Sequence, residues 1–272
     1  MKFLIRIIFC MLPVYLNAVA QNGNYELGAR SLGLSGANIT LTDAYSGFNN
    51  IGALANHHGT SVCFSSSMLY GIPDLLKIGL GFTGELFNGI GCVNLYRFGD
   101  QHLSEHKIGV GYSQRIRFIS LGVQLSYIQF LISGYGSAAS LSLEIGGLIE
   151  FSPKFLLGGY LFHPLLSGQR FGQLNFLPTI LKTGLSYRPS GNLMTNVEYK
   201  WNGNMEHSLI LGIEYLVRGK VALMTGLNTK SLQSTMGLGF SPGKFRLDFA
   251  IMIHPVLGIS QEFSVNINFQ HP

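Results

Sequence analysis

The stretch LGISQEFSVNINF, residues 257–269, alternates between apolar and polar residues with a period of two. One face carries Ile259, Phe263, Val265, Ile267 and Phe269, and the other face carries Ser260, Glu262, Ser264, Asn266 and Asn268. Residues 244–254 and 192–201 alternate in the same way. Alternation over about ten residues is typical of a strand with lipid on one side and a polar lumen on the other. The C-terminal region therefore predicts a transmembrane β-barrel.

Turn-forming residues interrupt this pattern at short intervals, for example at 71–74, 152–154, 188–191, 202–204, 218–220 and 241–244. We expect strands at residues 59–70, 75–83, 89–98, 106–114, 117–128, 138–151, 155–163, 179–187, 192–201, 205–216, 220–228, 232–240, 244–254 and 258–269. The sequence thus predicts an all-β, antiparallel barrel of about fourteen strands, an even number as in bacterial single-chain barrels. The longest connections, 99–105, 130–137 and 163–178, fall at one end of that barrel. Because outer loops are longer than periplasmic turns, both termini are predicted to be periplasmic.

Composition supports a membrane barrel over a soluble domain. Only 11% of the residues are charged and the mean hydropathy is positive, whereas soluble domains carry about 25% charged residues. After the first twenty residues we find no apolar run of the roughly 18 residues that a membrane helix needs. The net charge of +5 is spread along the chain, which argues against nucleic-acid binding. Cys63 and Cys92 fall in strands predicted to be two apart, too far for a disulfide.

The N-terminus predicts export. Lys2 and Arg6 precede an apolar run, and residues 18–20 read Ala-Val-Ala, a small-x-small cleavage pattern. We therefore divide the chain into a signal peptide (1–20), an N-terminal segment (21–58) and a barrel (59–272), located in the outer membrane.

The N-terminal segment contains GARSLGLSGANIT, residues 28–40, which is rich in small residues. Its glycines lack the spacing of a dinucleotide-binding loop, and it is too apolar for a linker. The predicted inward strand faces carry Gly79, Gly81, Gly109, Gly111, Gly122, Gly146, Gly184 and Gly212. Glycine inside a strand marks a close backbone approach. We predict that residues 21–58 form a plug that packs against these glycines inside the barrel.

The same segment resembles the N-terminal hatch of the FadL-like outer-membrane barrels, particularly the PorV/PorQ group of Bacteroidetes. The matching residues are Gly28, Ala29, Arg30, Gly33, Gly36, Ala37, Asp43 and Asn50. Ile51 follows Asn50 where the family has proline. The ending FRLDFAIMIHPVLGISQEFSVNINF is also similar to the family ending, although three residues follow Phe269. The resemblance implies a fourteen-stranded barrel with an N-terminal hatch.

Charged residues are predicted on the inward faces, where they can pair with each other or with the hatch. They are Lys77, Lys107, Glu144, Lys182, Glu198, Lys200, Glu214, Arg246 and Asp248. We favour a structural role in holding the plug, with a polar translocation path as the alternative. The motif HLSEH, residues 102–106, has the H-x-x-E-H form of a zinc protease but lacks the helix that this chemistry needs. We predict no enzyme, no metal and no cofactor.

Two functions from different classes stay open. The PorV/PorQ resemblance implies an adaptor or anchor subunit of an outer-membrane complex related to secretion, including the type IX system, with outer-membrane or periplasmic proteins as partners. FadL-type barrels imply passive transport of hydrophobic small molecules, with a lipid or fatty acid as ligand. The connection at 164–178 carries an apolar cluster that could be a contact patch for a partner or half of a ligand pocket. Its residues are Leu165, Leu166, Phe171, Leu174, Phe176 and Leu177. The short outer loops favour the adaptor.

Overall fold

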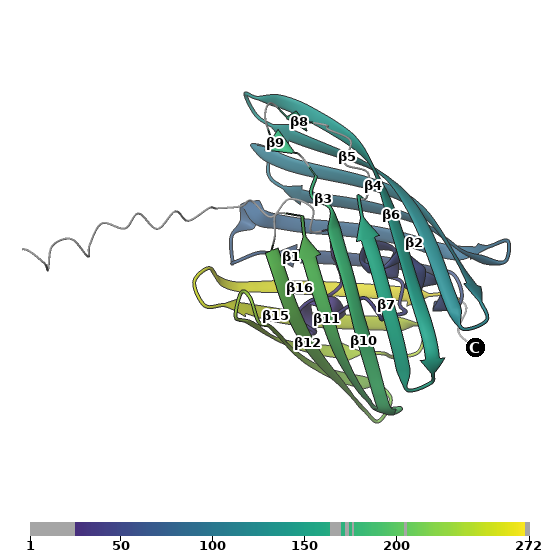
Figure 1. Cartoon of the computed structure of the whole chain (residues 1–272). Coiled ribbons are helices and arrows are strands. Elements are labelled where there is room, and N and C mark those ends of the chain that lie inside the picture. Colours follow the sequence, from purple (N-terminus) through teal and green to yellow (C-terminus); the bar gives the residue numbers. More distant parts are fainter. Residues whose placement is uncertain (1–24, 164–169, 172–173, 176, 204–205, 270–272) are drawn as a thin grey trace, which may run out of the picture.

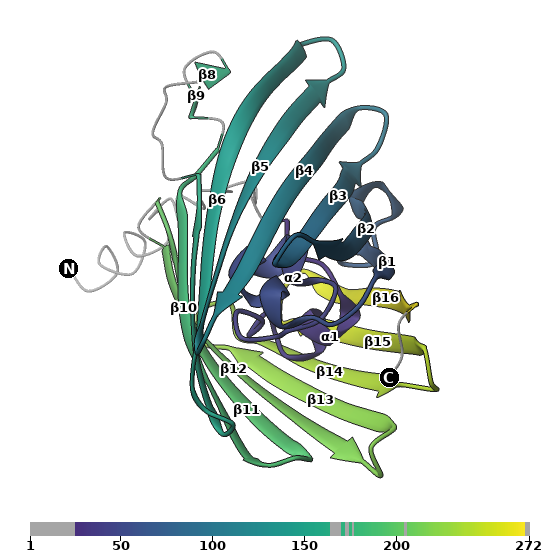
Figure 2. The same cartoon turned by 90° about the vertical axis from the view of Figure 1, so that its right-hand side faces the viewer.

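The computed structural model describes residues 25–163, 170–171, 174–175, 177–203 and 206–269, and these form a closed antiparallel barrel of fourteen strands (Figures 1 and 2). The strands are β1 (Ser61–Met68), β2 (Leu76–Leu86), β3 (Gly89–Gly99), β4 (Leu103–Ile116), β5 (Ile119–Ile132), β6 (Gly136–Ser152), β7 (Phe155–Phe162), β10 (Ile180–Ser190), β11 (Leu193–Asn202), β12 (Glu206–Val217), β13 (Val221–Asn228), β14 (Gln233–Phe240), β15 (Phe245–His254) and β16 (Gly258–Asn268). Each pairs with its neighbours in the chain, and β1 closes the ring against β16. The predicted fold class is confirmed.

The two faces of each strand meet different surroundings. On β5, Leu121, Val123 and Leu125 point outward and are half exposed, while the residues between them point inward and are buried. Because every second residue changes face, the period of two in the sequence becomes an apolar outer surface around a filled, polar lumen. No helix in the described part of the chain is long and apolar enough to cross a membrane.

Strands β4, β5 and β6 are longer than the sequence predicts. β4 begins at Leu103, and Ile132 of β5 pairs with Gly136 of β6, so the connections shrink to 100–102 and 133–135. The predicted loops at 99–105 and 130–137 are therefore wrong in length. For β4 the reason is that Glu105 is a lumen residue, which accepts a hydrogen bond from the Tyr25 hydroxyl. A polar run at the end of a barrel strand looks like a loop because the lumen is polar too.

The predicted turn at 188–191 is also shorter than expected. β10 continues to Ser190, with a register shift between Tyr187 and Ser190. Pro189 lies within this shift. Proline has no N–H to donate to a ladder and is confined to irregular strand positions, which accounts for the shift.

The barrel has two distinct ends. At the terminal end, the Phe269 N–H donates to the Thr60 carbonyl at 2.8 Å, joining the first and last strands. The loop end carries the longest connection, between β7 and β10, where β8 (Arg170–Phe171) pairs with β9 (Leu174–Asn175). The predicted signal peptide lies outside the described residues.

Residues 25–57, here called the internal segment, lie inside the barrel (Figure 2). They form α1 (Ala29–Gly33), α2 (Ser46–Asn49) and the 3-10 helix η2 (Ile51–Asn56). A further 3-10 helix, η3 (Pro73–Leu75), lies between β1 and β2. In the internal segment Leu27, Leu34, Ile39, Ile51 and Leu54 are at most 2% exposed. α1 lies against β13 to β16, and η2 lies against β3 to β7.

Glycines on the inward strand faces bring the internal segment close to the wall. A Cβ atom on Gly146 would lie 2.2 Å from the Asn50 side chain, and one on Gly122 would lie 2.5 Å from the Ile51 carbonyl oxygen. Gly184 faces Ile39 and Gly212 faces Leu34 in the same manner. Gly109 differs, since its neighbours are Gln124 and Ser126 of the wall itself. Any larger residue at the first four positions would collide with the internal segment.

Candidate functional site

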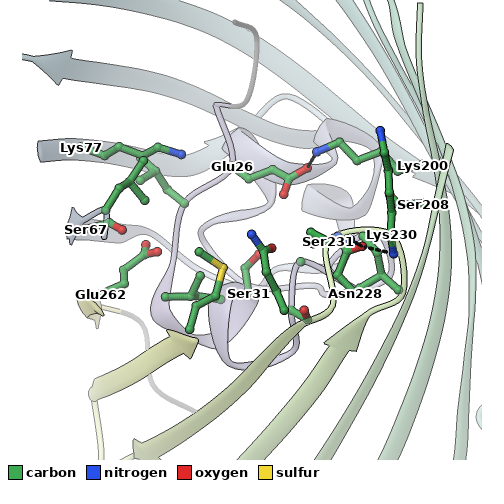
Figure 3. A pocket seen from close by; sticks show the side chains of 18 of the residues that line it. Glu26, Ser31, Ser67, Lys77, Lys200, Ser208, Asn228, Lys230, Ser231 and Glu262 are labelled. Carbon is green, nitrogen blue, oxygen red and sulfur yellow. Dashed lines mark hydrogen bonds and ion pairs between the residues drawn. The ribbon is translucent and has the colours of Figure 1, made fainter. Parts of the chain in front are cut away.

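A pocket of about 310 Å³ opens beside the internal segment toward the loop end (Figure 3). Residues 26–36 form one side of it. The other sides are formed by β1, β2, β15 and β16, near the contact between the first and last strands, and by β10 to β14, together with their connections. Its polar lining consists of Glu26, Ser31, Ser35, Ser67, Lys77, Lys200, Asn202, His207, Ser208, Asn228, Lys230, Ser231, Gln233 and Glu262. Its apolar lining consists of Leu27, Leu32, Leu69, Tyr70, Ile180, Ile210 and Met252, with Gly28 and Gly36 between them.

Glu26 connects the internal segment to the pocket wall. Its carboxylate lies 2.8 Å from the Lys200 ammonium (Figure 3). The Lys182 ammonium lies 3.3 Å from the same carboxylate. Burial raises the pKa of Glu26, but the ammonium groups of Lys182 and Lys200 outweigh burial and lower this pKa to about 2. Glu26 is therefore ionised at neutral pH, and both ion pairs are formed.

Lys182 and Glu198 extend this connection along the internal segment. The Lys182 ammonium donates to the Asn38 side-chain oxygen at 2.8 Å. Glu198 accepts hydrogen bonds from the backbone N–H groups of Asn38 and Ile39, both at 2.9 Å. Both hydrogen bonds go to the same oxygen of the carboxylate, and the other oxygen lies 3.8 Å from the Lys182 ammonium. These contacts fix the backbone of residues 38 and 39 to the barrel wall.

Arg30 forms a second ionic connection, on α1. Its guanidinium binds Glu214 through two hydrogen bonds, of 2.7 and 3.1 Å, and also binds Asp43 at 3.1 Å. Burial lowers the pKa of Arg30, but the carboxylates of Glu214 and Asp43 raise this pKa by more than burial lowers it. The guanidinium therefore stays charged. Arg246 lies 3.8 Å from Glu214 and 2.9 Å from Asp248, which joins β12 and β15 to the same network.

The wall formed by β16 binds the start of α1. Glu262 accepts from the Gly28 N–H at 2.6 Å and from the Ser65 hydroxyl at 2.6 Å. Figure 3 shows Glu262 on the same side of the pocket as Ser67 and Lys77, across from Glu26 and Lys200. Each of these two sides of the pocket therefore carries one carboxylate and one ammonium group.

A second buried group of residues lies between the internal segment and β3 to β7. The Lys107 ammonium is 2.5 Å from Glu144 and 4.6 Å from the centre of the Tyr25 ring. Glu144 also accepts from the Tyr160 hydroxyl at 2.7 Å. Phe162 packs on Tyr25 with ring centres 5.4 Å apart. This side of the lumen is closed by aromatic rings around one buried ion pair.

The structure brings together the predicted hatch residues and the predicted lumen charges. Gly28, Ala29, Arg30, Gly33, Gly36, Asp43 and Asn50 all lie in the internal segment. Lys182, Glu198, Lys200, Glu214, Arg246 and Asp248 point into the lumen, and the contacts above link most of them to that segment. Leu177 is buried with the aromatic group. Leu165, Leu166 and Phe176 lie outside the described residues, and Phe171 and Leu174 are placed only as members of β8 and β9.

Sequence reasoning missed Glu26, the aromatic residues around Lys107 and the pocket itself. Glu26 lies two residues before the Gly-Ala-Arg motif, in a stretch with no pattern of its own. The pocket lining comes from strands far apart in the chain, so no local motif could indicate it. Cys63 and Cys92 are free and buried. Among the described residues, no three His, Cys, Asp or Glu side chains are placed to hold a metal ion.

No protein-family model and no curated protein matches this chain. Solved structures do match its fold. The P. putida toluene transporter TodX has a TM-score of 0.67 at 11% identity, covering 92% of this chain and 100% of that chain. The Ralstonia pickettii toluene transporter TbuX has a TM-score of 0.66 at 10% identity, covering 91% and 99%. The Acinetobacter baumannii outer membrane protein Omp33 has a TM-score of 0.51 at 8% identity, covering 78% and 98%.

At these identities the likeness is one of fold alone. It extends over nearly the whole of TodX and TbuX and over about nine tenths of this chain. The chain shares the barrel fold of TodX and TbuX.

Proposed function

We propose that this protein is a passive transporter of small amphipathic molecules across the outer membrane. The observation that carries the proposal is the pocket of about 310 Å³ at the loop end, whose side is formed by the internal segment. A volume of this size lies at the lower end of the range for small-molecule sites. The similarity of fold to the toluene transporters TodX and TbuX favours transport over the adaptor function.

The lining of the pocket supports an amphipathic solute rather than a bare hydrocarbon. Leu27, Leu69 and Met252 offer apolar surface, whereas serine, asparagine and lysine side chains offer hydrogen bonds. A hydrocarbon in this pocket would cover polar groups without replacing their hydrogen bonds to water, at a cost of about 1–3 kcal/mol for each group. A solute with an apolar body and one polar head avoids that cost.

The internal segment supports a closed resting state. Its two ionic connections, through Glu26 and Arg30, join it to β10, β11 and β12. Passage from the pocket to the terminal end requires part of this segment to move, since inward glycines let it lie directly against the wall. Glu26 is the connection that a solute in the pocket would contact, because its carboxylate lines the pocket.

We also propose the arrangement in the membrane. An apolar outer surface and a barrel fold support insertion in the outer membrane. The short turns at the terminal end support a periplasmic location for that end and for both termini. Residues 1–20 then act as the signal peptide, and the internal segment acts as a hatch.

Equilibrium binding of radiolabelled octanoate to the purified protein tests the proposal. Ser208 lines the pocket, whereas Leu209, the next residue, is 42% exposed on the outer surface. We expect Ser208→Trp to fill the pocket and weaken octanoate binding at least about tenfold, and Leu209→Trp to bind like the wild type. Glucose, which has no apolar body, should bind to none of the three.

Two results would contradict the proposal. One is wild-type protein that binds no octanoate and co-purifies with a stoichiometric outer-membrane or periplasmic protein, which is the adaptor function implied by the PorV/PorQ resemblance. The other is octanoate binding that Ser208→Trp leaves unchanged, which would move the ligand site away from the pocket.

A further inference from the structure

Basic residues gather at the terminal end of the barrel. Counted among the described residues, five neighbouring strand connections at this end carry or adjoin them: Arg115 and Arg117 between β4 and β5, Lys154 between β6 and β7, Arg188 at the end of β10, Arg218 and Lys220 between β12 and β13, and Lys244 between β14 and β15. These connections are adjacent around the ring. We call this set the basic arc. The β2–β3 turn, which contains Phe87 and Asn88, has no basic residue.

The loop end shows no such excess. Its described connections contain Asp74, Asp100, Arg170 and Lys230, which are two acidic and two basic residues. The excess of basic residues is therefore confined to the rim at the terminal end, and the overall net charge of the chain does not explain it. At the terminal end the acidic residues near the arc are Glu85 and Glu150.

Most side chains of the basic arc are exposed and form no ion pair with another described residue. Arg115 pairs with Glu150 at 2.6 Å. Arg117, Lys154, Arg218, Lys220 and Lys244 are exposed, and none of these five side chains forms an ion pair with another described residue. Unpaired like charges along one rim repel each other, and an anion bound beside them reduces this repulsion.

Exposed aromatic residues place the arc at the level of lipid headgroups. Phe118 follows Arg117, Phe155 follows Lys154, and Phe245 follows Lys244, with the rings 54%, 42% and 48% exposed. Aromatic residues form girdles at the boundary between the apolar band and water in outer-membrane barrels. Each of these basic residues therefore lies one position outside the lipid-facing band, where its stem can lie along the rings and its charge can reach the headgroups.

We infer that the basic arc binds the headgroups of anionic phospholipids in the leaflet at the terminal end. The charge complementarity is direct, because each Lys or Arg can contact a headgroup phosphate. The arc continues the lipid-facing surface, so a bound lipid keeps its acyl chains against the apolar strands below. The gap at the β2–β3 turn and the β1–β16 seam confines these lipids to one side of the barrel. Attraction of this kind weakens with salt.

Native mass spectrometry of the whole protein, released from mixed micelles with equal phosphatidylglycerol and phosphatidylcholine, tests this inference. We expect the wild type to retain phosphatidylglycerol over phosphatidylcholine. In the variant Arg117→Gln/Lys154→Gln/Arg218→Gln/Lys220→Gln/Lys244→Gln, this preference should fall at least about tenfold. Because all five residues lie in exposed turns, the variant should keep the heat-modifiable gel migration of a folded barrel.

Two controls separate charge and position. Lys154→Arg/Lys220→Arg/Lys244→Arg keeps the charge and should retain the wild-type preference. Arg97→Gln removes an exposed charge from the outer face of β3 near the loop end and should also have no effect. A preference that survives in the folded five-residue variant would overturn the inference. The inference would also be overturned if the wild type showed no lipid preference and bound polyglutamate through the arc. That result would indicate an acidic protein partner instead of a lipid.

Discussion

At the scale of single residues, Glu26 links the internal segment to two strands of the barrel through its ion pairs. It is the shared partner of Lys182 and Lys200, and it lines the pocket. The sequence placed both lysines in the lumen, because alternation along a strand decides which way each side chain points. It did not indicate Glu26, since that residue lies in an irregular stretch where direction depends on tertiary contacts.

The acidity of Glu26 predicts how stability depends on pH. The two lysines outweigh burial and hold its pKa at about 2, below the ordinary value of 4.5. Its contribution, about 3 kcal/mol, is fully present above pH 4.5 and is lost as the pH falls toward 2. We expect thermal unfolding of Glu26→Gln in detergent to begin below that of the wild type at pH 7, and the two to converge near pH 2. A constant difference across this range would show that the Glu26 ion pairs do not stabilise the fold.

At the scale of elements, the strands were predictable and the connections were not. Alternate residues face the lumen and the outer surface and differ in polarity, so about fourteen strands could be located from the period of two together with the turn residues. The start of β4 was missed because its lumen residues Ser104 and Glu105 are as polar as loop residues. The predicted inward glycines were informative for a steric reason, since most of them face the internal segment.

The packing of η2 on β6 gives a prediction at this scale. A Cβ atom on Gly146 would lie 2.2 Å from the Asn50 side chain and 2.6 Å from the Gly52 nitrogen, whereas one on Gly147 would lie no nearer than 3.4 Å to any neighbour. Gly146→Ala should therefore lower the free energy of unfolding by about 1–3 kcal/mol, while Gly147→Ala should change it by less than about 0.5 kcal/mol. Denaturant titration in detergent measures both. Equal effects of the two substitutions would mean that η2 does not pack on β6 as described.

At the scale of the whole molecule, three zones follow one another along the barrel. A pocket lined by polar and apolar residues lies at the loop end, the internal segment occupies the middle, and the basic arc follows part of the rim at the terminal end. Composition indicated a membrane protein, because a soluble domain carries about 25% charged residues and this chain has 11%. The strand alternation and the lack of a long apolar run then indicated a barrel. The pocket could not be predicted, since it exists only where distant strands and the internal segment meet.

The most direct test of the transport proposal is uptake of radiolabelled octanoate into proteoliposomes at pH 8, where the carboxylate is ionised and crosses lipid slowly. We expect wild-type protein to give saturable uptake above that of empty vesicles, with little uptake of glucose, and Leu209→Trp to match it. Ser208→Trp should reduce octanoate uptake, and Glu26→Gln should increase it by loosening the internal segment. Uptake equal to that of empty vesicles for the wild type and Glu26→Gln alike, or equal uptake of glucose and octanoate, would contradict a closed barrel that transports amphipathic solutes.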